Sequence, residues 1–121
     1  MIDALIIDDN RNMVDGLRKI LSLLGVSARA AYGPRSGMMA FNEKSPDVVF
    51  LDINMPGVDG FEVFSYFKRN PEFQQTPVIV VTSDDQPETA ARAEAMGAVT
   101  LILKPVSFEA LESALQQAGL L

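Results

Sequence analysis

Several apolar segments of this sequence end in residues that could bind a metal ion or transfer a charged group. These residues are Asp8, Asp9, Asp52, Thr82 and Lys104. If the segments are neighbouring parallel strands, their carboxyl ends meet at one edge of a sheet and the three carboxylates repel one another. Such repulsion raises the proton affinity of at least one carboxyl group or requires a cation. A ligand set made only of oxygen atoms and water suits Mg²⁺.

The same residue types suit the transfer of a phosphoryl group to a carboxylate. An Asp can act as the nucleophile and form an acyl phosphate. Catalysis then consists mainly of positioning and of neutralising charge on the equatorial phosphoryl oxygens. Mg²⁺ could take one oxygen, the Lys104 ammonium another, and the Thr82 hydroxyl with neighbouring backbone N–H groups the third.

Each polar residue taken alone has an ordinary structural explanation. Asp8 or Asp9 could cap a helix that starts near Asn10. Thr82 could begin a turn, and Lys104 could be a solvated strand end. Their joint occurrence at the ends of four strands is what indicates a site.

The composition excludes several other kinds of site. The chain has no Cys and no His, which rules out disulfides, Cys/His zinc sites and Ser-His-Asp triads. A net charge of -6 argues against nucleic-acid binding by this chain. No stretch approaches the roughly 20 apolar residues of a membrane span, and the start lacks the basic opening of a secretory signal. We therefore expect a cytoplasmic protein that does not bind a membrane.

Five apolar runs of strand length must position these polar residues. They are Ala4–Ile7, Val26–Ala31, Val48–Leu51, Val78–Val81 and Val99–Leu103. Most are continuous rather than alternating, as is typical of parallel strands covered on both faces.

Segments with helical spacing lie between and after the strands. The apolar stripes are Met13, Leu17, Ile20, Leu21 and Leu24, then Phe61, Phe64 and Phe67, then Phe108, Leu111, Leu115 and Ala118. We expect their aromatic residues to lie in the core. A Gly-Pro pair indicates a helix over 34–43, and Asp85 with Glu88 resembles a capping box for a helix over 86–96. Gly25, Gly97 and Gly33 stand where left-handed caps or chain reversals are expected.

Strand therefore alternates with helix through five units. This order predicts an α/β fold with a parallel sheet, right-handed crossovers and helices on both faces. The 121 residues contain no linker or repeat and match the usual size of one compact domain. We expect residues 1–121 to form a single domain.

The sequence resembles the receiver domains of bacterial response regulators. The matching pieces are the acidic pair in 5–9, the stretch DVVFLDINMPGVDG over 47–60, Thr82-Ser83 and Lys104-Pro105. Together they cover essentially the whole chain. The resemblance implies a doubly wound, flavodoxin-like fold whose five-stranded parallel sheet has the order 2-1-3-4-5, with five helices.

The resemblance also implies a role for each acidic residue. Asp52 is similar to the phosphoacceptor, and Asp9 and Asp52 to direct ligands of Mg²⁺. Asp8 is similar to a ligand acting through water, and Asn54 to the residue that offers its backbone carbonyl to the metal. No other cofactor is implied.

Two further residues are implied to act on the phosphoryl group. Thr82 resembles the switch hydroxyl that moves toward it, and Lys104 the lysine that pairs with it. Pro105 would follow a cis peptide bond. Asn54 and Asp84 would flank the path of a water that hydrolyses the acyl phosphate.

Receivers accept phosphate from a phosphohistidine on a sensor kinase or a histidine phosphotransfer protein. They signal by conformational switching to an output domain or a downstream protein. The resemblance therefore implies a phosphoprotein of two-component signal transduction that catalyses only its own phosphorylation and dephosphorylation and is not otherwise an enzyme.

Three other classes of protein share features of this sequence. Phosphatases of the haloacid dehalogenase type also place a nucleophilic Asp at a strand end, but usually carry a second Asp two residues later, where this chain has Asn54. A degenerate receiver would keep the fold as an interaction module without phosphorylation, although the complete set of site residues does not demand this. The third alternative is a nucleotide-binding protein of similar topology. It would carry G-x-x-x-x-G-K-[ST] or G-x-G-x-x-G after the first strand, and this sequence has neither pattern there.

One residue departs from the receiver pattern. Receivers usually carry Tyr, Phe or His three residues before the lysine, and here that position is Leu101. Leucine has no ring and no polar group to exchange between a buried and an exposed state. We expect phosphorylation to change the loop after Thr82 and the start of the next helix but to perturb Leu101 only slightly.

Overall fold

A computed structural model describes residues 1–121, in which five strands alternate with five helices. The strands are β1 (Ile2–Ile7), β2 (Val26–Ala31), β3 (Val48–Asp52), β4 (Val78–Thr82) and β5 (Thr100–Leu103). The helices are α1 (Arg11–Leu23), α2 (Pro34–Glu43), α3 (Gly60–Arg69), α4 (Pro87–Ala95) and α5 (Phe108–Gln117). The five apolar runs are thus confirmed as strands, and their bounds differ from the expected ones by at most two residues.

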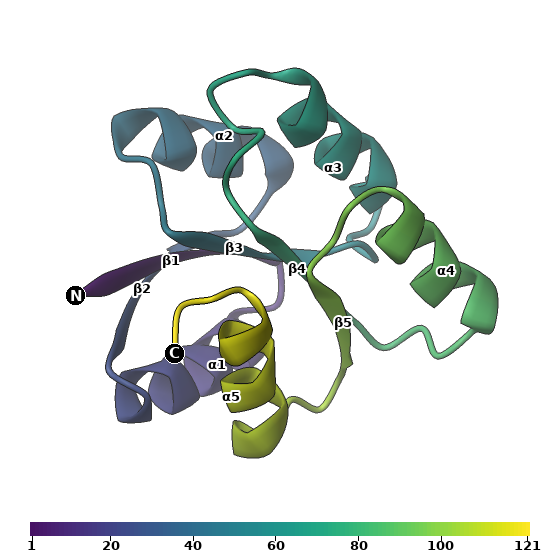
Figure 1. Cartoon of the computed structure of the whole chain (residues 1–121). Helices are drawn as coiled ribbons and strands as arrows, with labels where there is room; N and C mark the ends of the chain where they lie inside the picture. The colour runs from purple at the N-terminus through teal and green to yellow at the C-terminus, as the bar shows by residue number, and fades with distance from the viewer.

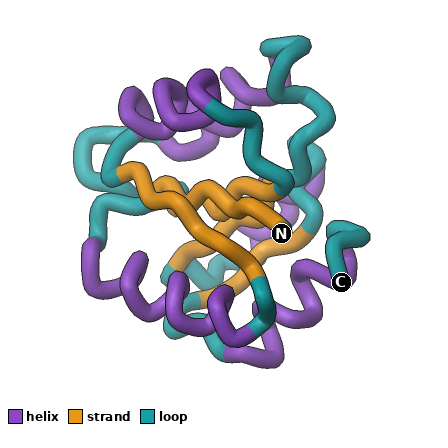
Figure 2. The backbone as a smooth tube through the Cα atoms, turned by 90° about the vertical axis from the view of Figure 1, so that its left-hand side faces the viewer, coloured by secondary structure: helices purple, strands orange, loops and turns teal.

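The strands form one parallel sheet in the order β2-β1-β3-β4-β5. Helices α2, α3 and α4 cover one face, and α1 and α5 cover the other (Figure 1). Seen from the side, the strands form a central layer with helices on both sides (Figure 2). The expected doubly wound α/β fold and its strand order are therefore confirmed.

Side chains that alternate along each strand enter two separate cores. Leu5, Ile7, Val49 and Leu51 pack toward α2 and α3, whereas Ala4, Ile6, Val48 and Phe50 pack toward α1 and α5. Because the central strands are covered on both faces, their continuous apolar sequences have no polar alternation. Burial of this apolar area is the main stabilising force that holds the site at the sheet edge.

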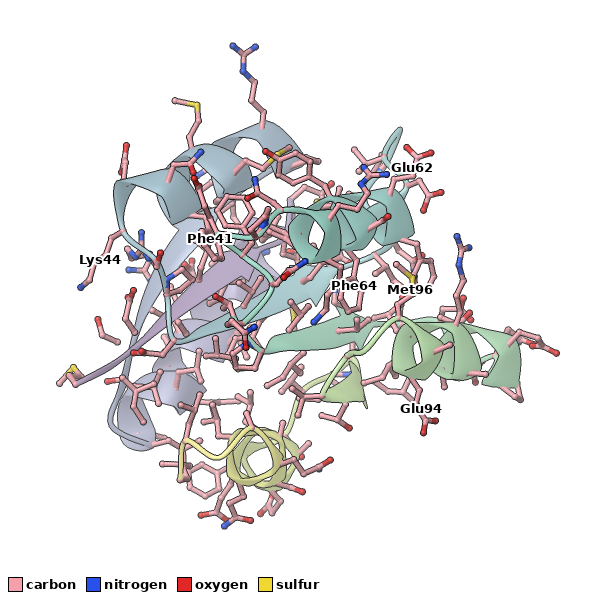
Figure 3. The ribbon with its side chains drawn as sticks, turned by 45° about the horizontal axis from the view of Figure 1, so that its top comes forward. Phe41, Lys44, Glu62, Phe64, Glu94 and Met96 are labelled. Carbon is pink, nitrogen blue, oxygen red and sulfur yellow. The ribbon has the colours of Figure 1, made fainter.

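The predicted aromatic core is confirmed on α3 and wrong on α5. Phe61, Phe64 and Phe67 are buried, and Figure 3 shows Phe64 on the side of α3 that faces the sheet. Phe108 is 38% exposed because it is the first residue of α5, before the turn whose Leu111 packs on the sheet.

Two predicted local features are also wrong. Gly33 is extended (φ -170°) and acts as the N-cap of α2, whereas Gly25 and Gly97 do have positive φ. The N-cap of α4 is Gln86 rather than Asp85, and its side chain makes no capping hydrogen bond. The carboxylate that bonds to the start of α4 is that of Asp84, which accepts from Gln86 N–H.

Candidate functional site

Lys104 joins two of the predicted acidic residues at the carboxyl edge of the sheet. Its Nζ donates to Asp8 Oδ2 at 3.0 Å and lies 3.4 Å from Asp52 Oδ2. Asp8 follows β1, Asp52 ends β3, and Lys104 follows β5, so three strands contribute to the group. The register of the parallel sheet sets their strand ends level with one another.

Backbone N–H groups hold both buried carboxylates. Asn10 N–H donates to Asp8 Oδ1 at 2.9 Å, and Asn54 N–H donates to Asp52 Oδ1 at 2.9 Å. Each contact spans two residues, because the chain turns immediately after its strand. Asp8 and Asp52 are each only 3% exposed. Because the N–H groups bond to Oδ1, the Oδ2 atom of each carboxylate is left for Lys104 or another cation.

Asp9 completes a cluster of three carboxylates. One oxygen each from Asp8, Asp9 and Asp52 lies within 4.8 Å of the others, and Asp9 is exposed whereas the other two are buried. The helix after β1 is capped by Asn10, whose side chain accepts from Met13 N–H. Neither Asp8 nor Asp9 is therefore needed as the N-cap of α1, which removes one ordinary explanation for them.

The surroundings of Asp52 shift its pKa. Burial raises the pKa of Asp52 above its ordinary value, and the charge of Asp8 adds to the increase. The Asn54 N–H and the Lys104 ammonium oppose this change but do not cancel it. The sequence predicted a raised proton affinity from repulsion between carboxylates, whereas the larger cause is loss of solvation.

Thr82 lies at the end of β4, beside this cluster, and is completely buried. Its hydroxyl oxygen accepts from Asn54 Nδ2 at 2.6 Å and from Asp84 N–H at 3.0 Å. Its backbone carbonyl accepts from Lys104 N–H at 2.8 Å, which ties the end of β4 to β5. The Thr82 hydroxyl is thus held by Asn54, two residues after Asp52, and by Asp84, two residues after Thr82.

The arrangement brings together the residues that the sequence proposed. Asp8, Asp9, Asp52 and Lys104 form one group, and Thr82 is linked to it through Asn54. The peptide bond between Lys104 and Pro105 is cis, as the resemblance implied.

Other contacts of the site were missed by sequence reasoning. These are the Asn54 side chain on Thr82 and the pairing of Lys104 with Asp8. The sequence did contain a signal for the contact between Asn54 and Thr82. Asn54 carries an amide only two residues after Asp52, so its side chain starts near the end of the same strand. The second depends on side-chain direction, for which the sequence offered no signal.

The donor set fits a hard divalent cation. It consists of carboxylate oxygens from Asp8, Asp9 and Asp52, of which Asp9 is exposed, and it contains no His or Cys ligand. Two of the carboxylates are already partly neutralised by one ammonium group. Such a set can hold one cation and still be open to solvent through Asp9.

Comparisons with known proteins agree with this geometry. A family model described as "Response regulator receiver domain" matches residues 4–116. Protein PilH of Pseudomonas aeruginosa is 32% identical over 111 residues, which is 92% of this chain and 92% of PilH. The solved structure of the chemotaxis protein CheY4 of Vibrio cholerae covers 98% of each chain with a TM-score of 0.88 at 26% identity.

Some relatives are much longer than this chain. Regulatory protein AtoC of Escherichia coli is 32% identical over 114 residues, which is 94% of this chain but only 24% of AtoC. The matched region is therefore a unit that occurs both nearly alone and as a part of larger proteins.

Proposed function

The chain belongs to the response regulator receiver domain family of two-component systems, and from that premise we propose that residues 1–121 form one receiver domain phosphorylated on Asp52. The observation that carries the proposal is the placement of Lys104 Nζ against both Asp8 and Asp52 at the edge where β1, β3 and β5 end. Transfer of a negatively charged phosphoryl group to a carboxylate needs positive charge held beside that carboxylate, and the Lys104 ammonium is such a charge.

Asp9, Asp52 and the Asn54 carbonyl would bind Mg²⁺ directly, and Asp8 would bind it through water. When bound, Mg²⁺ supplies neutralising charge to the phosphoryl oxygens. The exposed Asp9 leaves the site accessible, while the N–H groups of Asn10 and Asn54 keep the other two carboxylates in place.

In the proposed reaction an oxygen of Asp52 attacks the phosphorus of a phosphohistidine. The new P–O bond forms as the P–N bond breaks, and the electron pair of that bond returns to the imidazole nitrogen of the donor. Lys104 neutralises one phosphoryl oxygen, and the Thr82 hydroxyl donates to another. Asp52 reacts as the carboxylate. Burial raises its pKa and disfavours that form, and a bound cation would favour it again.

The chain contains no histidine, so a phosphohistidine donor must lie outside residues 1–121. Receivers of this family interact with kinases and output domains, and we propose a sensor histidine kinase or a histidine phosphotransfer protein as the donor. The signal would pass by conformational change to an output domain or a downstream protein. None of the five helices has the length and hydropathy to cross a bilayer, and a cytoplasmic location is part of the proposal.

A direct test uses acetyl phosphate as a small donor with and without Mg²⁺. We expect intact-mass measurement to show one added phosphoryl group only when Mg²⁺ is present, with acetate as the leaving group. Asp52→Asn and Asp52→Ala should abolish the addition, whereas Asp15→Asn on the exposed surface of α1 should leave it unchanged. Equal labelling of the wild type and Asp52→Ala would overturn the assignment.

The remaining alternatives give different results in the same experiment. A degenerate receiver would take no phosphoryl group under any condition. A phosphatase of the haloacid dehalogenase type would turn over phosphate esters continuously. The Asn54 side chain contacts Thr82, and an amide cannot act there as the general acid that such a phosphatase needs.

A further inference from the structure

A chain of hydrogen bonds leads from Asp52 to the first turn of α4. Asp52 accepts from Asn54 N–H, and the Asn54 side chain donates to the Thr82 hydroxyl. The same hydroxyl accepts from Asp84 N–H, and the Asp84 carboxylate then accepts from Thr89 Oγ1 at 2.7 Å. The chain ends inside α4, seven residues beyond Thr82 in the sequence.

Asp84 has two anchors on α4. Its Oδ1 accepts from Gln86 N–H at 2.9 Å and its Oδ2 from the Thr89 hydroxyl. These two contacts also lower the pKa of Asp84, and the Thr89 hydroxyl is the larger cause. The carboxylate is therefore ionised at neutral pH and accepts both bonds in its stronger, charged form.

The start of α4 has few other attachments. Gln86 is its N-cap but makes no side-chain capping bond, and Ala93 is the only buried residue of the helix. Further along, the Arg92 guanidinium lies 4.2 Å from the centre of the Phe61 ring on α3. The Asp84 carboxylate therefore holds the start of α4 through Gln86 and Thr89. The same two hydrogen bonds fix the position of Asp84.

We propose that Thr89 is a positioning residue for the receiver reaction, which acts through Asp84 to hold the Thr82 hydroxyl at the site. Thr89 fixes the Asp84 carboxylate, and the Asp84 N–H fixes one lone pair of Thr82 Oγ1. Because Asn54 Nδ2 occupies the other lone pair, the O–H of Thr82 is left to donate to a phosphoryl oxygen. This inference rests on the proposed phosphorylation of Asp52.

The coupling must work in both directions. If the state of Thr82 affects α4 through Asp84, a partner that moves the first turn of α4 must change the position of the Thr82 hydroxyl. This route does not use Leu101, which lacks the ring that receivers usually carry. Loss of the Thr89 hydroxyl should therefore slow phosphorylation even though the Thr89 side chain makes no hydrogen bond with Asp8, Asp9, Asp52 or Lys104.

The decisive variant is Thr89→Val, since valine keeps the β-branched shape and removes only the hydroxyl. We expect the rate of phosphorylation by acetyl phosphate to fall about fivefold, the size of the loss of one ordinary hydrogen bond. Thr89→Ser should restore the rate, and Mg²⁺ affinity should not change. Thr76→Val, at a threonine whose side chain makes no hydrogen bond in the structure, is the matched control and should behave as the wild type.

A double-mutant cycle separates positioning from general loss of stability. In a Thr82→Val background, Thr89→Val should have no further effect on the rate, because the hydroxyl that it positions is gone. Equal, additive losses in both backgrounds would overturn the inference.

Amide exchange in the resting protein, without donor or metal, provides a readout that does not depend on phosphorylation. In Thr89→Val the Asp84 and Gln86 amides should exchange faster, while the amides of β3 and β4 keep their protection. Unchanged exchange at Asp84 together with an unchanged rate would refute the role of Thr89. If the wild type takes no phosphoryl group but Asp84 responds, the proposed function fails and the link between Thr89 and Asp84 stands.

Discussion

Lys104 donates to Asp8 Oδ2 at 3.0 Å, although 96 positions separate the two residues in the sequence. The ammonium lies at the point where a metal cation is expected to compete for the same carboxylate. Lys104→Met should therefore bind Mg²⁺ more tightly than the wild type, by severalfold, because a neighbouring positive charge has been removed.

The same variant should unfold more readily in the absence of divalent cations, by about 1–3 kcal/mol, since two buried carboxylates lose their partner. Calorimetric titration and urea unfolding measure the two effects. Lys19→Met, which removes an exposed charge from α1, is the control for net charge. Weaker Mg²⁺ binding in Lys104→Met than in this control would contradict the predicted competition.

A second prediction concerns the pH dependence of stability at Asp52. Because burial raises its pKa in the folded chain, folding favours the protonated form. The wild type should lose stability relative to Asp52→Asn as pH rises from about 4, the ordinary Asp value, through the raised pKa. Above that pKa the difference in the free energy of unfolding between the wild type and Asp52→Asn should have reached its full size and stay constant.

Urea unfolding of both proteins without divalent cations, over pH 4 to 8, would measure this effect. Asp15→Asn is the control, because Asp15 is exposed on α1. A wild type that gains stability over Asp52→Asn as pH rises would show that Lys104 and Asn54 outweigh burial.

A third prediction concerns the glycine at the start of α3. A Cβ on Gly60 would clash with the backbone Cα of Ile53, in the turn that follows Asp52. Gly60→Ala should destabilise the fold by about 3 kcal/mol or more, because a backbone atom must move. Gly16→Ala in α1 meets no atom within 4 Å and should be neutral or stabilise by about 0.5–1 kcal/mol. Equal effects on the midpoint of thermal unfolding would contradict this.

A fourth prediction concerns the end of the sheet opposite the site. Arg29 pairs with Asp3 at 2.9 Å and donates to the carbonyl oxygens of Ala40 and Lys44 at the end of α2. Arg29→Met should lower the free energy of unfolding by about 1–3 kcal/mol, because a part-buried charge and the last carbonyls of a helix lose their partner. Arg18→Met, at an exposed position of α1, should change it by no more than about 0.5 kcal/mol.

The last prediction concerns Leu101, the departure from the receiver pattern. Leu101 is partly buried and lines a cavity of about 300 Å³ between α4 and β5, together with Ala90 and Ala93. Binding of beryllofluoride at Asp52 should shift the amide signals of 83–89 strongly and those of Leu101 and Ile102 weakly. The reason is that rotation of a leucine side chain changes few hydrogen bonds and little buried area, so it favours neither state strongly.

Leu101→Phe provides the comparison, because the cavity leaves room for part of a ring. Beryllofluoride should shift the signals of β5 more in this variant than in the wild type. Shifts centred on Leu101 in the wild type would show that leucine itself serves as the switch.

Much of the fold and of the candidate site could be predicted because local patterns encode burial. Continuous apolar runs such as Val48–Leu51 indicated strands covered on both faces, and all five were confirmed. Parallel strands end at one edge, so Asp8, Asp52 and Lys104 were expected at the same edge once the strands were recognised. The strand order that sets how near they lie was implied by the family resemblance. The helix over 34–43 was also confirmed to the residue, because a Gly-Pro pair marks its start.

The contacts within the site were decided by tertiary structure. Lys104 turns toward Asp8 as well as Asp52, Asn54 holds Thr82, and Asp84 rather than Asp85 anchors α4. Periodicity says which face of an element is buried, but not which rotamer a polar side chain adopts at its end. That choice depends on the register of β1, β3, β4 and β5 and on which hydrogen-bond partners the whole packed sheet leaves within reach.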